Sequence, residues 1–264
     1  MADDRPVGVF DSGVGGVSIL RHIRDQLPFE QCIYVADSRE FPYGTKPAPD
    51  IKRRCERIVD FLLAQRSKAI VVACNTASVT ALAHLRDRYA IPFVGIVPGV
   101  KPAAGLTRTG TIGVLATPTT ADSEPLAQLI EQFAYGVAVK TQICPGLVSL
   151  VERGITDGPE VERLARRYLD PLLEAGADVI VLGCTHYPLL RTAIQRICGP
   201  DVALVDPSDA VARQLGHILA SHGLASEGPA GSTRYYTTGE PDELGRVLTA
   251  LAGSVAGTVA HADI

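Results

Sequence analysis

Two cysteines lie at matched positions in the sequence, and their surroundings suggest acid–base chemistry. Cys74 ends an apolar run that begins at Ala69, and small polar residues follow it directly. Cys184 ends a second aliphatic run, which begins near Asp178, and Thr-His-Tyr-Pro follows it. Two thiols in equivalent places could remove a proton from one face of a carbon and deliver a proton to the other face. This reaction would invert a stereocentre, and a thiol pKa of about 8.5 is close enough to neutrality to serve it.

Other cysteine chemistries fit the pattern less well. A papain-like nucleophile uses one cysteine with a base and an orienting group, so the second matched thiol would be redundant. A metal site could use Cys74, Cys184 and His186, but their spacing fits no standard ligand pattern. No two of the six cysteines form a CxxC motif, which disfavours a disulfide oxidoreductase or a zinc ribbon. The other four are interpreted as small buried hydrophobic residues: Cys32, Cys55, Cys144 and Cys198.

Each thiol would need a neighbouring group that sets its protonation state. Asp11 ends the first apolar run, and His186 follows Cys184 by two residues, so both are candidates for this role. A structural role is the alternative for each, because Asp11 could cap a loop and His186 could be a satisfied, half-buried imidazole. Ionisable groups that cluster at one site are typical of active sites, so we prefer the functional interpretation.

Short apolar runs alternate with amphipathic patterns along the chain, which predicts an α/β fold with parallel sheets flanked by helices. Strands are predicted at 6–11, 33–37, 69–73, 92–97, 111–116, 137–143, 178–183, 202–205 and 233–238. Helices are predicted at 17–27, 51–65, 76–89, 117–133, 159–175, 209–222 and 241–251, with a further helix that ends near Cys198. Residues 38–50 are predicted to be a long loop with a function, and 98–105 a linker.

The carboxyl ends of parallel strands are where ligands bind in such folds. Asp11, Cys74 and the loop after Asp37 all fall at that edge. Asn75 and Thr76 open the next helix, where hydroxyl, amide and backbone donors could hold an anion. The glycine-rich segment after Asp11 is neither a P-loop nor a GxGxxG motif, so the sequence gives little support for nucleotide binding.

The two halves of the chain share their spacing as well as their cysteines. Cys74 lies 63 residues after Asp11 (11 to 74), and Cys184 lies 67 residues after Thr117 (117 to 184). This near-equality predicts two pseudo-symmetric domains that face each other across a cleft. Chance similarity between generic α/β segments is the alternative.

Bulk composition excludes several function classes. The 264 residues carry a formal net charge of −4, which provides no basic surface for nucleic acid. No run approaches the roughly 18 apolar residues that a membrane span needs. The acidic first residues are unlike a secretory signal, so free thiols in a reducing cytoplasm are expected.

Four motifs together resemble the bacterial glutamate racemase family, within the aspartate/glutamate racemase superfamily. They are Asp11-Ser-Gly-Val-Gly-Gly, Pro42-Tyr-Gly, Ala73-Cys-Asn-Thr-Ala-Ser and Gly183-Cys-Thr-His-Tyr-Pro-Leu-Leu. The resemblance extends from about residue 7 to residue 239. Single segments of this kind also occur in other racemases of the superfamily, whereas both cysteine motifs together with the first loop are specific.

The resemblance implies interconversion of L- and D-glutamate without a cofactor or a metal, with D-glutamate destined for peptidoglycan. It implies that Cys74 handles the α-proton of the D enantiomer and Cys184 that of the L enantiomer. Asp11 and His186 would assist the respective thiols, and Glu152 matches a third family carboxylate beside His186. Substrate contacts are implied at Asp11, Ser12, Pro42, Tyr43, Gly44, Asn75, Thr76, Thr117, Thr120, Thr185 and His186.

The resemblance also carries expectations about organisation and partners. The second domain would be an insertion at 98–206, and residues 1–97 plus 207–264 would form the first. A cytoplasmic homodimer is expected, and an interaction with DNA gyrase is a role associated with some members. Aspartate or another acidic amino acid as the substrate is the alternative within the same enzyme class.

Overall fold

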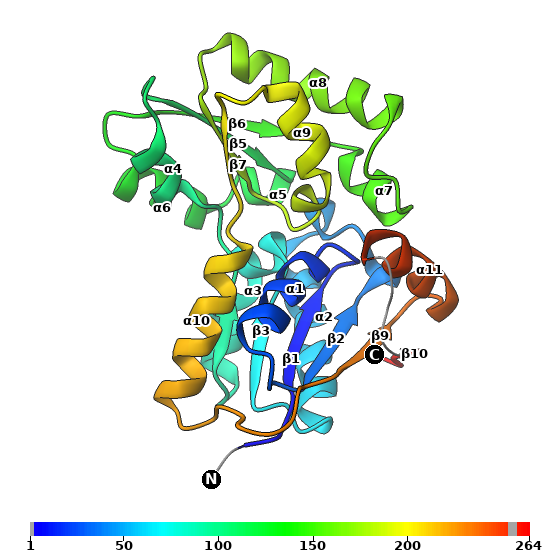
Figure 1. Cartoon of the computed structure of the whole chain (residues 1–264). Coiled ribbons are helices and arrows are strands. Elements are labelled where there is room, and N and C mark those ends of the chain that lie inside the picture. Colours follow the sequence, from blue (N-terminus) through cyan, green and yellow to red (C-terminus); the bar gives the residue numbers. More distant parts are fainter. Residues whose placement is uncertain (1–2, 253–257) are drawn as a thin grey trace.

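The strands of the chain form two separate parallel sheets, one above the other in Figure 1. The computed structural model describes residues 3–252 and 258–264. Within that part of the chain, the larger sheet has the order β10-β9-β2-β1-β3-β4 and the smaller has the order β6-β5-β7-β8. The larger sheet contains β1 (Val7–Asp11), β2 (Cys32–Ala36), β3 (Ala69–Val72), β4 (Phe93–Gly95), β9 (Thr233–Thr237) and β10 (Val259–His261). The smaller contains β5 (Thr111–Ala116), β6 (Ala138–Ile143), β7 (Val179–Leu182) and β8 (Ala203–Val205).

Strand order confirms the pseudo-symmetry that the spacing predicted. Four strands of the larger sheet run β2-β1-β3-β4, and the smaller sheet repeats this order as β6-β5-β7-β8. β1 therefore corresponds to β5, and β3 corresponds to β7. Cys74 follows β3 and Cys184 follows β7, so the two thiols leave equivalent strands. The chain thus consists of two related α/β domains.

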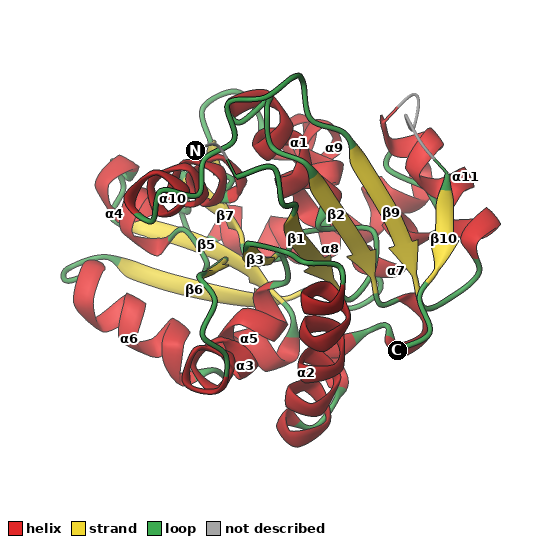
Figure 2. Ribbon diagram, turned by 90° about the horizontal axis from the view of Figure 1, so that it is seen from below, coloured by secondary structure: helices red, strands yellow, loops and turns green. Residues whose placement is uncertain are grey.

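Helices cover both faces of each sheet, because the buried strands are apolar on both sides. On the larger sheet, one face is covered by α1 (Val17–Gln26), α10 (Ser208–Ser221) and α11 (Pro241–Ala252), and the other by α2 (Ala48–Ala64) and α3 (Asn75–Arg88). Figure 2 shows this sheet between α1 and α2. Alternating residues of β1 divide between the two cores, with Val9 facing α1 and Phe10 facing α2.

The smaller sheet is covered in the same way. One face packs against α7 (Leu147–Glu152), α8 (Pro159–Glu174) and α9 (Arg191–Cys198), and the other against α4 (Val100–Leu106) and α6 (Glu124–Phe133). Short helical segments complete the chain: α5 (Pro118–Ala121) and the 3₁₀ turns η1 (Ser38–Glu40), η2 (Tyr43–Thr45) and η3 (Tyr187–Leu190). Both η2 and α5 lie at the carboxyl edges, where the site is.

The structure corrects three details of the predicted elements. The expected linker at 98–105 contains α4, since Pro102 falls in the first turn of that helix, where a missing N–H is tolerated. The single helix expected at 117–133 is two helices, because Ser123 caps the second and Pro125 lies in its first turn. The short β10 was not predicted, and it pairs in parallel with β9.

Within residues 3–252 and 258–264, none of the helices is long and apolar enough to cross a membrane.

Candidate active site

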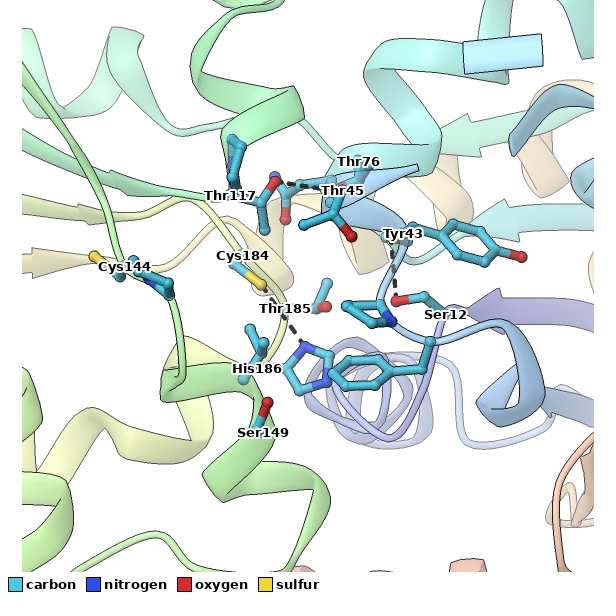
Figure 3. Close-up of a pocket in the computed structure, with 18 of the residues that line it drawn as sticks. Ser12, Tyr43, Thr45, Thr76, Thr117, Cys144, Ser149, Cys184, Thr185 and His186 are labelled. Atoms are coloured by element: carbon cyan, nitrogen blue, oxygen red, sulfur yellow. Dashed lines mark hydrogen bonds between the residues drawn. The ribbon is translucent and has the colours of Figure 1, made fainter. Parts of the chain in front are cut away.

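The carboxyl edges of the two sheets face each other and enclose a pocket of about 710 Å³, including its open mouth. A cleft of this size is typical of small-molecule sites. Both candidate thiols line it, together with most of the residues that the sequence had singled out. These are Ser12, Pro42, Tyr43, Gly44, Cys74, Asn75, Thr76, Thr117, Cys184, Thr185 and His186. Figure 3 shows the labelled members of this group converging from both domains.

Cys74 occupies the N-cap position of α3, and both hydrogen-bond partners of its thiol are neutral groups. Its Sγ accepts a hydrogen bond from the Ala77 N–H at 3.5 Å and donates one to Ser12 Oγ at 3.8 Å. Burial raises the pKa of Cys74 well above its usual value, and the nearby Asp11 carboxylate raises it further. The Cys74 thiol therefore holds its proton at neutral pH.

Asp11 lies behind Ser12, not in the pocket wall, and it is completely buried. Its carboxylate accepts the Ser12 N–H at 2.8 Å, the Gly16 N–H at 2.7 Å and the Thr185 hydroxyl at 3.2 Å. Burial raises the pKa of Asp11, with His186 opposing the shift and Glu152 adding to it. Ser12 Oγ, 3.4 Å from Asp11 Oδ1, connects this carboxylate to the Cys74 thiol.

Cys184 has a different partner, an imidazole. Its Sγ lies 3.7 Å from His186 Nδ1, and the other ring nitrogen, Nε2, lies 2.6 Å from Glu152 Oε1. Burial lowers the pKa of His186, but the hydrogen bonds to Cys184 and Glu152 outweigh it and raise that pKa well above its usual value. A protonated imidazole therefore lies between a sulfur and a carboxylate, arranged to exchange a proton with the sulfur.

Glu152 reaches this position from the end of α7, on the second domain. Its Oε1 also accepts the Val14 N–H of the first domain at 2.8 Å. A Cβ on Gly13 would lie 2.0 Å from Glu152 Oε1, so a side chain there would displace the Glu152 carboxylate from this position. Glu152 therefore joins the two domains and orients His186 at the same time.

Further hydrogen bonds across the cleft hold the two domains face to face, as the sequence predicted. Ser18 Oγ donates to the Thr185 carbonyl at 3.2 Å, close to the Thr185–Asp11 bond. A Cβ on Gly15 would lie 2.4 Å from His186 Nδ1, so this loop too comes close to the second domain. Gly13 and Gly15 of the first loop therefore permit close approach between the domains.

Polar groups with free bonding capacity line one wall of the pocket. Asn75 is buried, and neither atom of its amide has a partner among the described residues. Thr76 Oγ1 lies 3.0 Å from Thr117 Oγ1, which in turn donates to Thr120 Oγ1 at 3.0 Å. Thr120 lies behind this wall and does not line the pocket. A buried amide without a partner is costly, and a ligand carboxylate would accept hydrogen bonds from its NH₂ group.

Tyr43 lines the pocket, but its hydroxyl is bonded elsewhere. The phenol donates to Asp37, a buried carboxylate that also accepts two bonds from Arg54, each at 2.7 Å. Figure 3 shows the hydroxyl end of the Tyr43 ring directed away from the pocket. Tyr43 therefore presents its backbone and ring to a ligand, not its hydroxyl.

Some pocket residues were not found from the sequence. They are Phe41, Thr45, Pro118, Cys144, Pro145, Gly146, Val148, Ser149 and Tyr187. The Phe41 ring lies 5.8 Å from that of His186, centroid to centroid. Cys144 follows β6 at the same carboxyl edge as Cys184, so the strand-end rule could have included it.

In the described part of the chain, no group of three or more His, Cys, Asp or Glu side chains is arranged to hold a metal ion. The alternative ligand set of Cys74, Cys184 and His186 is therefore not assembled as such a group.

Comparison with known proteins gives consistent matches over nearly the whole chain. The Asp/Glu/Hydantoin racemase family model matches residues 7–215. The glutamate racemase of Pseudomonas paraeruginosa (strain DSM 24068 / PA7) is 49% identical over 254 residues, which cover 96% of each chain. Escherichia coli glutamate racemase, solved with L-glutamate and the activator UDP-MurNAc-ala, has a TM-score of 0.86 at 33% identity, over 97% of this chain and 98% of that one. The Francisella tularensis enzyme, solved with D-glutamate, has a TM-score of 0.85 at 33% identity, over 99% and 98%.

Proposed function

Since the chain belongs to the Asp/Glu/hydantoin racemase family and is an amino-acid racemase, we propose that it interconverts L- and D-glutamate by a two-thiol reaction without a cofactor. The observation that carries this proposal is the pair of buried thiols, Cys74 and Cys184, which follow equivalent strands and line one pocket. Its relatives include glutamate racemases, and two similar structures hold opposite enantiomers of glutamate.

The reaction starting from L-glutamate uses the two thiols in opposite roles. Cys184, as thiolate, removes the α-proton, so that the C–H bond breaks and an S–H bond forms. Cys74, as thiol, gives its proton to the opposite face of the same carbon, so that a new C–H bond forms. The product is D-glutamate, and the reverse reaction exchanges the two roles.

The surroundings of each thiol support this starting state. The raised pKa of Cys74 keeps it protonated, ready to donate. The raised pKa of His186 keeps a positive charge 3.7 Å from the Cys184 sulfur, where it stabilises a thiolate. For D-glutamate, Cys74 must first lose its proton, and Ser12 provides a route to the buried Asp11 carboxylate.

Substrate carboxylates would be held by neutral donors. The Asn75 amide, the hydroxyls of Thr76, Thr117 and Thr185, and the free N–H groups at the start of α3 suit these anions. No Lys or Arg occurs among the lining residues of the described pocket. A cation there would bind the thiolates as well as the substrate, so neutral donors leave the proton chemistry undisturbed.

Circular dichroism of L-glutamate tests the proposed function. The purified protein, with no cofactor added, is expected to bring the signal to zero as the two enantiomers reach equal concentration. Loss of the L-aspartate signal instead would assign the substrate to the shorter acidic amino acid. An unchanged signal with both would sink the proposal.

We also propose the finer organisation that goes with this activity. The first domain would comprise 1–97 plus 207–264, with 98–206 as the second, in a homodimeric cytoplasmic enzyme that supplies D-glutamate for peptidoglycan. Light scattering tests the dimer, and depletion in the source cell, with and without external D-glutamate, tests the cell-wall role. Binding to DNA gyrase stays a prediction from the resemblance, and a pull-down under cell conditions tests it.

A further inference from the structure

One hydrogen bond closes the pocket on the side of the segment Phe41–Thr45. Thr119 Oγ1, in α5 of the second domain, donates to the Gly44 carbonyl of η2 in the first domain at 2.9 Å. Both Gly44 and the neighbouring Thr117 line the pocket. Thr119 itself does not line it, so its hydroxyl acts on the wall and not on a bound molecule.

The two domains are in close contact at this point. A Cβ on Gly44 would lie 2.9 Å from Thr117 Cβ, so η2 lies directly against the start of α5. The Thr76–Thr117 hydroxyl contact, at 3.0 Å, is a second bond between the domains in the same region. The Thr119 hydroxyl thus holds the Phe41–Thr45 segment against the second domain, and the Thr76–Thr117 contact joins α3 to the second domain beside it.

The opposite side of the cleft is joined in another way. There Glu152, which holds His186 within the second domain, accepts the Val14 N–H of the first domain, and the Thr185 hydroxyl donates to Asp11. Separation of the domains on that side would therefore remove a hydrogen-bond donor from each of the two carboxylates. The Thr119–Gly44 bond, in contrast, involves no residue that is bonded to a thiol or to its partner. Pro42 and Thr45, next to it, are exposed while lining the pocket, which places the pocket mouth beside this bond.

We propose that Thr119 is a positioning residue that latches the Phe41–Thr45 segment over the pocket, and that glutamate enters and leaves when this latch opens. The inference rests on the proposed function for the identity of the substrate. The latch fixes Gly44 and Tyr43 in the pocket wall, and the Glu152 side keeps the domains together while it is open.

Three variants test the latch. Thr119→Val removes the hydroxyl and keeps the shape, Thr119→Ser keeps the hydroxyl, and Thr249→Val removes a hydroxyl-to-carbonyl bond inside α11, away from the cleft. We expect Thr119→Val to raise KM about fivefold for both enantiomers without lowering kcat, because binding weakens and the thiols stay in place. Thr119→Ser and Thr249→Val are expected to behave as wild type.

Amide hydrogen exchange of the peptide covering residues 38–46 gives a readout that needs no activity. Exchange is expected to be faster in Thr119→Val than in wild type, and unchanged in Thr119→Ser. Unchanged exchange in Thr119→Val overturns the latch, and faster exchange with an unchanged KM overturns its role in substrate binding. If the wild type fails to racemise glutamate, the proposed function fails and the exchange result still decides the latch. Thr119→Ala replaces the valine variant if the latter does not fold.

Discussion

The two thiols leave equivalent strands of related domains, yet their surroundings are not equivalent. Cys74 is bordered by a hydroxyl, a backbone N–H and, behind them, the buried Asp11 carboxylate. Cys184 is bordered by an imidazole that is itself held by Glu152. Related backbones thus place two sulfurs symmetrically, and unrelated side chains control their protons.

This difference follows from the reaction proposed for the pocket. An enzyme that starts with one thiol and one thiolate needs surroundings that favour opposite protonation states. A buried carboxylate favours the neutral thiol, and a protonated imidazole favours the anion. The two enantiomers have equal free energy in water, so the equilibrium constant is one and kcat/KM must be equal in both directions. The asymmetry can therefore appear in kcat and KM taken separately and in the two half-reactions, but not in kcat/KM.

Replacing either cysteine is expected to lower the racemisation rate more than any other substitution considered for the site. Cys74→Ser and Cys184→Ser are each expected to lower racemisation at least about 10³-fold, because a serine hydroxyl is a far weaker acid than a thiol. Each variant should keep one-sided exchange at the α-carbon. In heavy water, Cys74→Ser is expected to exchange L-glutamate only and Cys184→Ser D-glutamate only, as followed by NMR.

Two outcomes would contradict this assignment. Racemisation at the normal rate by either variant would remove the two-base mechanism. Exchange of the opposite enantiomer would keep two bases but invert their roles.

Replacing His186 or Asp11 is expected to slow only the half-reaction of the thiol that the residue assists, and by less than replacing the thiol itself. In the Cys74→Ser background, His186→Asn is expected to slow the remaining L-glutamate exchange about 100-fold, since the partner of Cys184 is lost. In the Cys184→Ser background, Asp11→Asn is expected to do the same for D-glutamate. Each substitution in the other background serves as the control and should change exchange less than about threefold. Equal losses in both backgrounds would mean that the two groups support the fold and not individual thiols.

The raised pKa of Cys74 gives a pH signature for its half-reaction. A raised thiol pKa means that the thiol dominates below it, and the thiolate fraction rises tenfold for each pH unit. In Cys184→Ser, wash-out of an α-tritium label from D-glutamate at low substrate concentration should therefore rise about tenfold per unit between about pH 6.5 and 8.5. A flat profile would show that Cys74 is already a thiolate at neutral pH.

The fold and the thiol pair could be predicted because both depend on local patterns. Apolar runs marked the strands, and the carboxyl-edge rule placed Asp11, Cys74 and Asn75 at one edge. The repeated spacing predicted the relation between the halves, which the strand order confirms. The break between α5 and α6 was missed although Ser123 followed by Pro125 is a helix-start signal, because the helical pattern continues across it.

Side-chain direction could not be predicted in the same way. A helical glutamate is usually exposed, yet Glu152 Oε1 lies 2.6 Å from His186 Nε2. Its partners, Val14 and His186, are distant in sequence, and only the packing of the domains brings the three together. Cys144 was interpreted as core only, and the fold also places it in the pocket wall.

Replacing Tyr43 is expected to have the smallest effect on activity. It tests whether Tyr43 only lines the pocket or also binds the substrate through its hydroxyl. Because its hydroxyl bonds Asp37 and not the pocket, Tyr43→Phe is expected to change KM and kcat less than about twofold. The same change leaves a buried carboxylate with one donor fewer, which costs about 1–2 kcal/mol and lowers Tm by a few degrees in a chain of this size. Tyr89→Phe is the matched control, because Tyr89 also bonds an aspartate, Asp60, but at the surface, so its Tm should change less. A large rise in KM for Tyr43→Phe with an unchanged Tm would mean that the Tyr43 hydroxyl bonds the substrate. The pocket wall around Asp37 would then have to rearrange when glutamate binds.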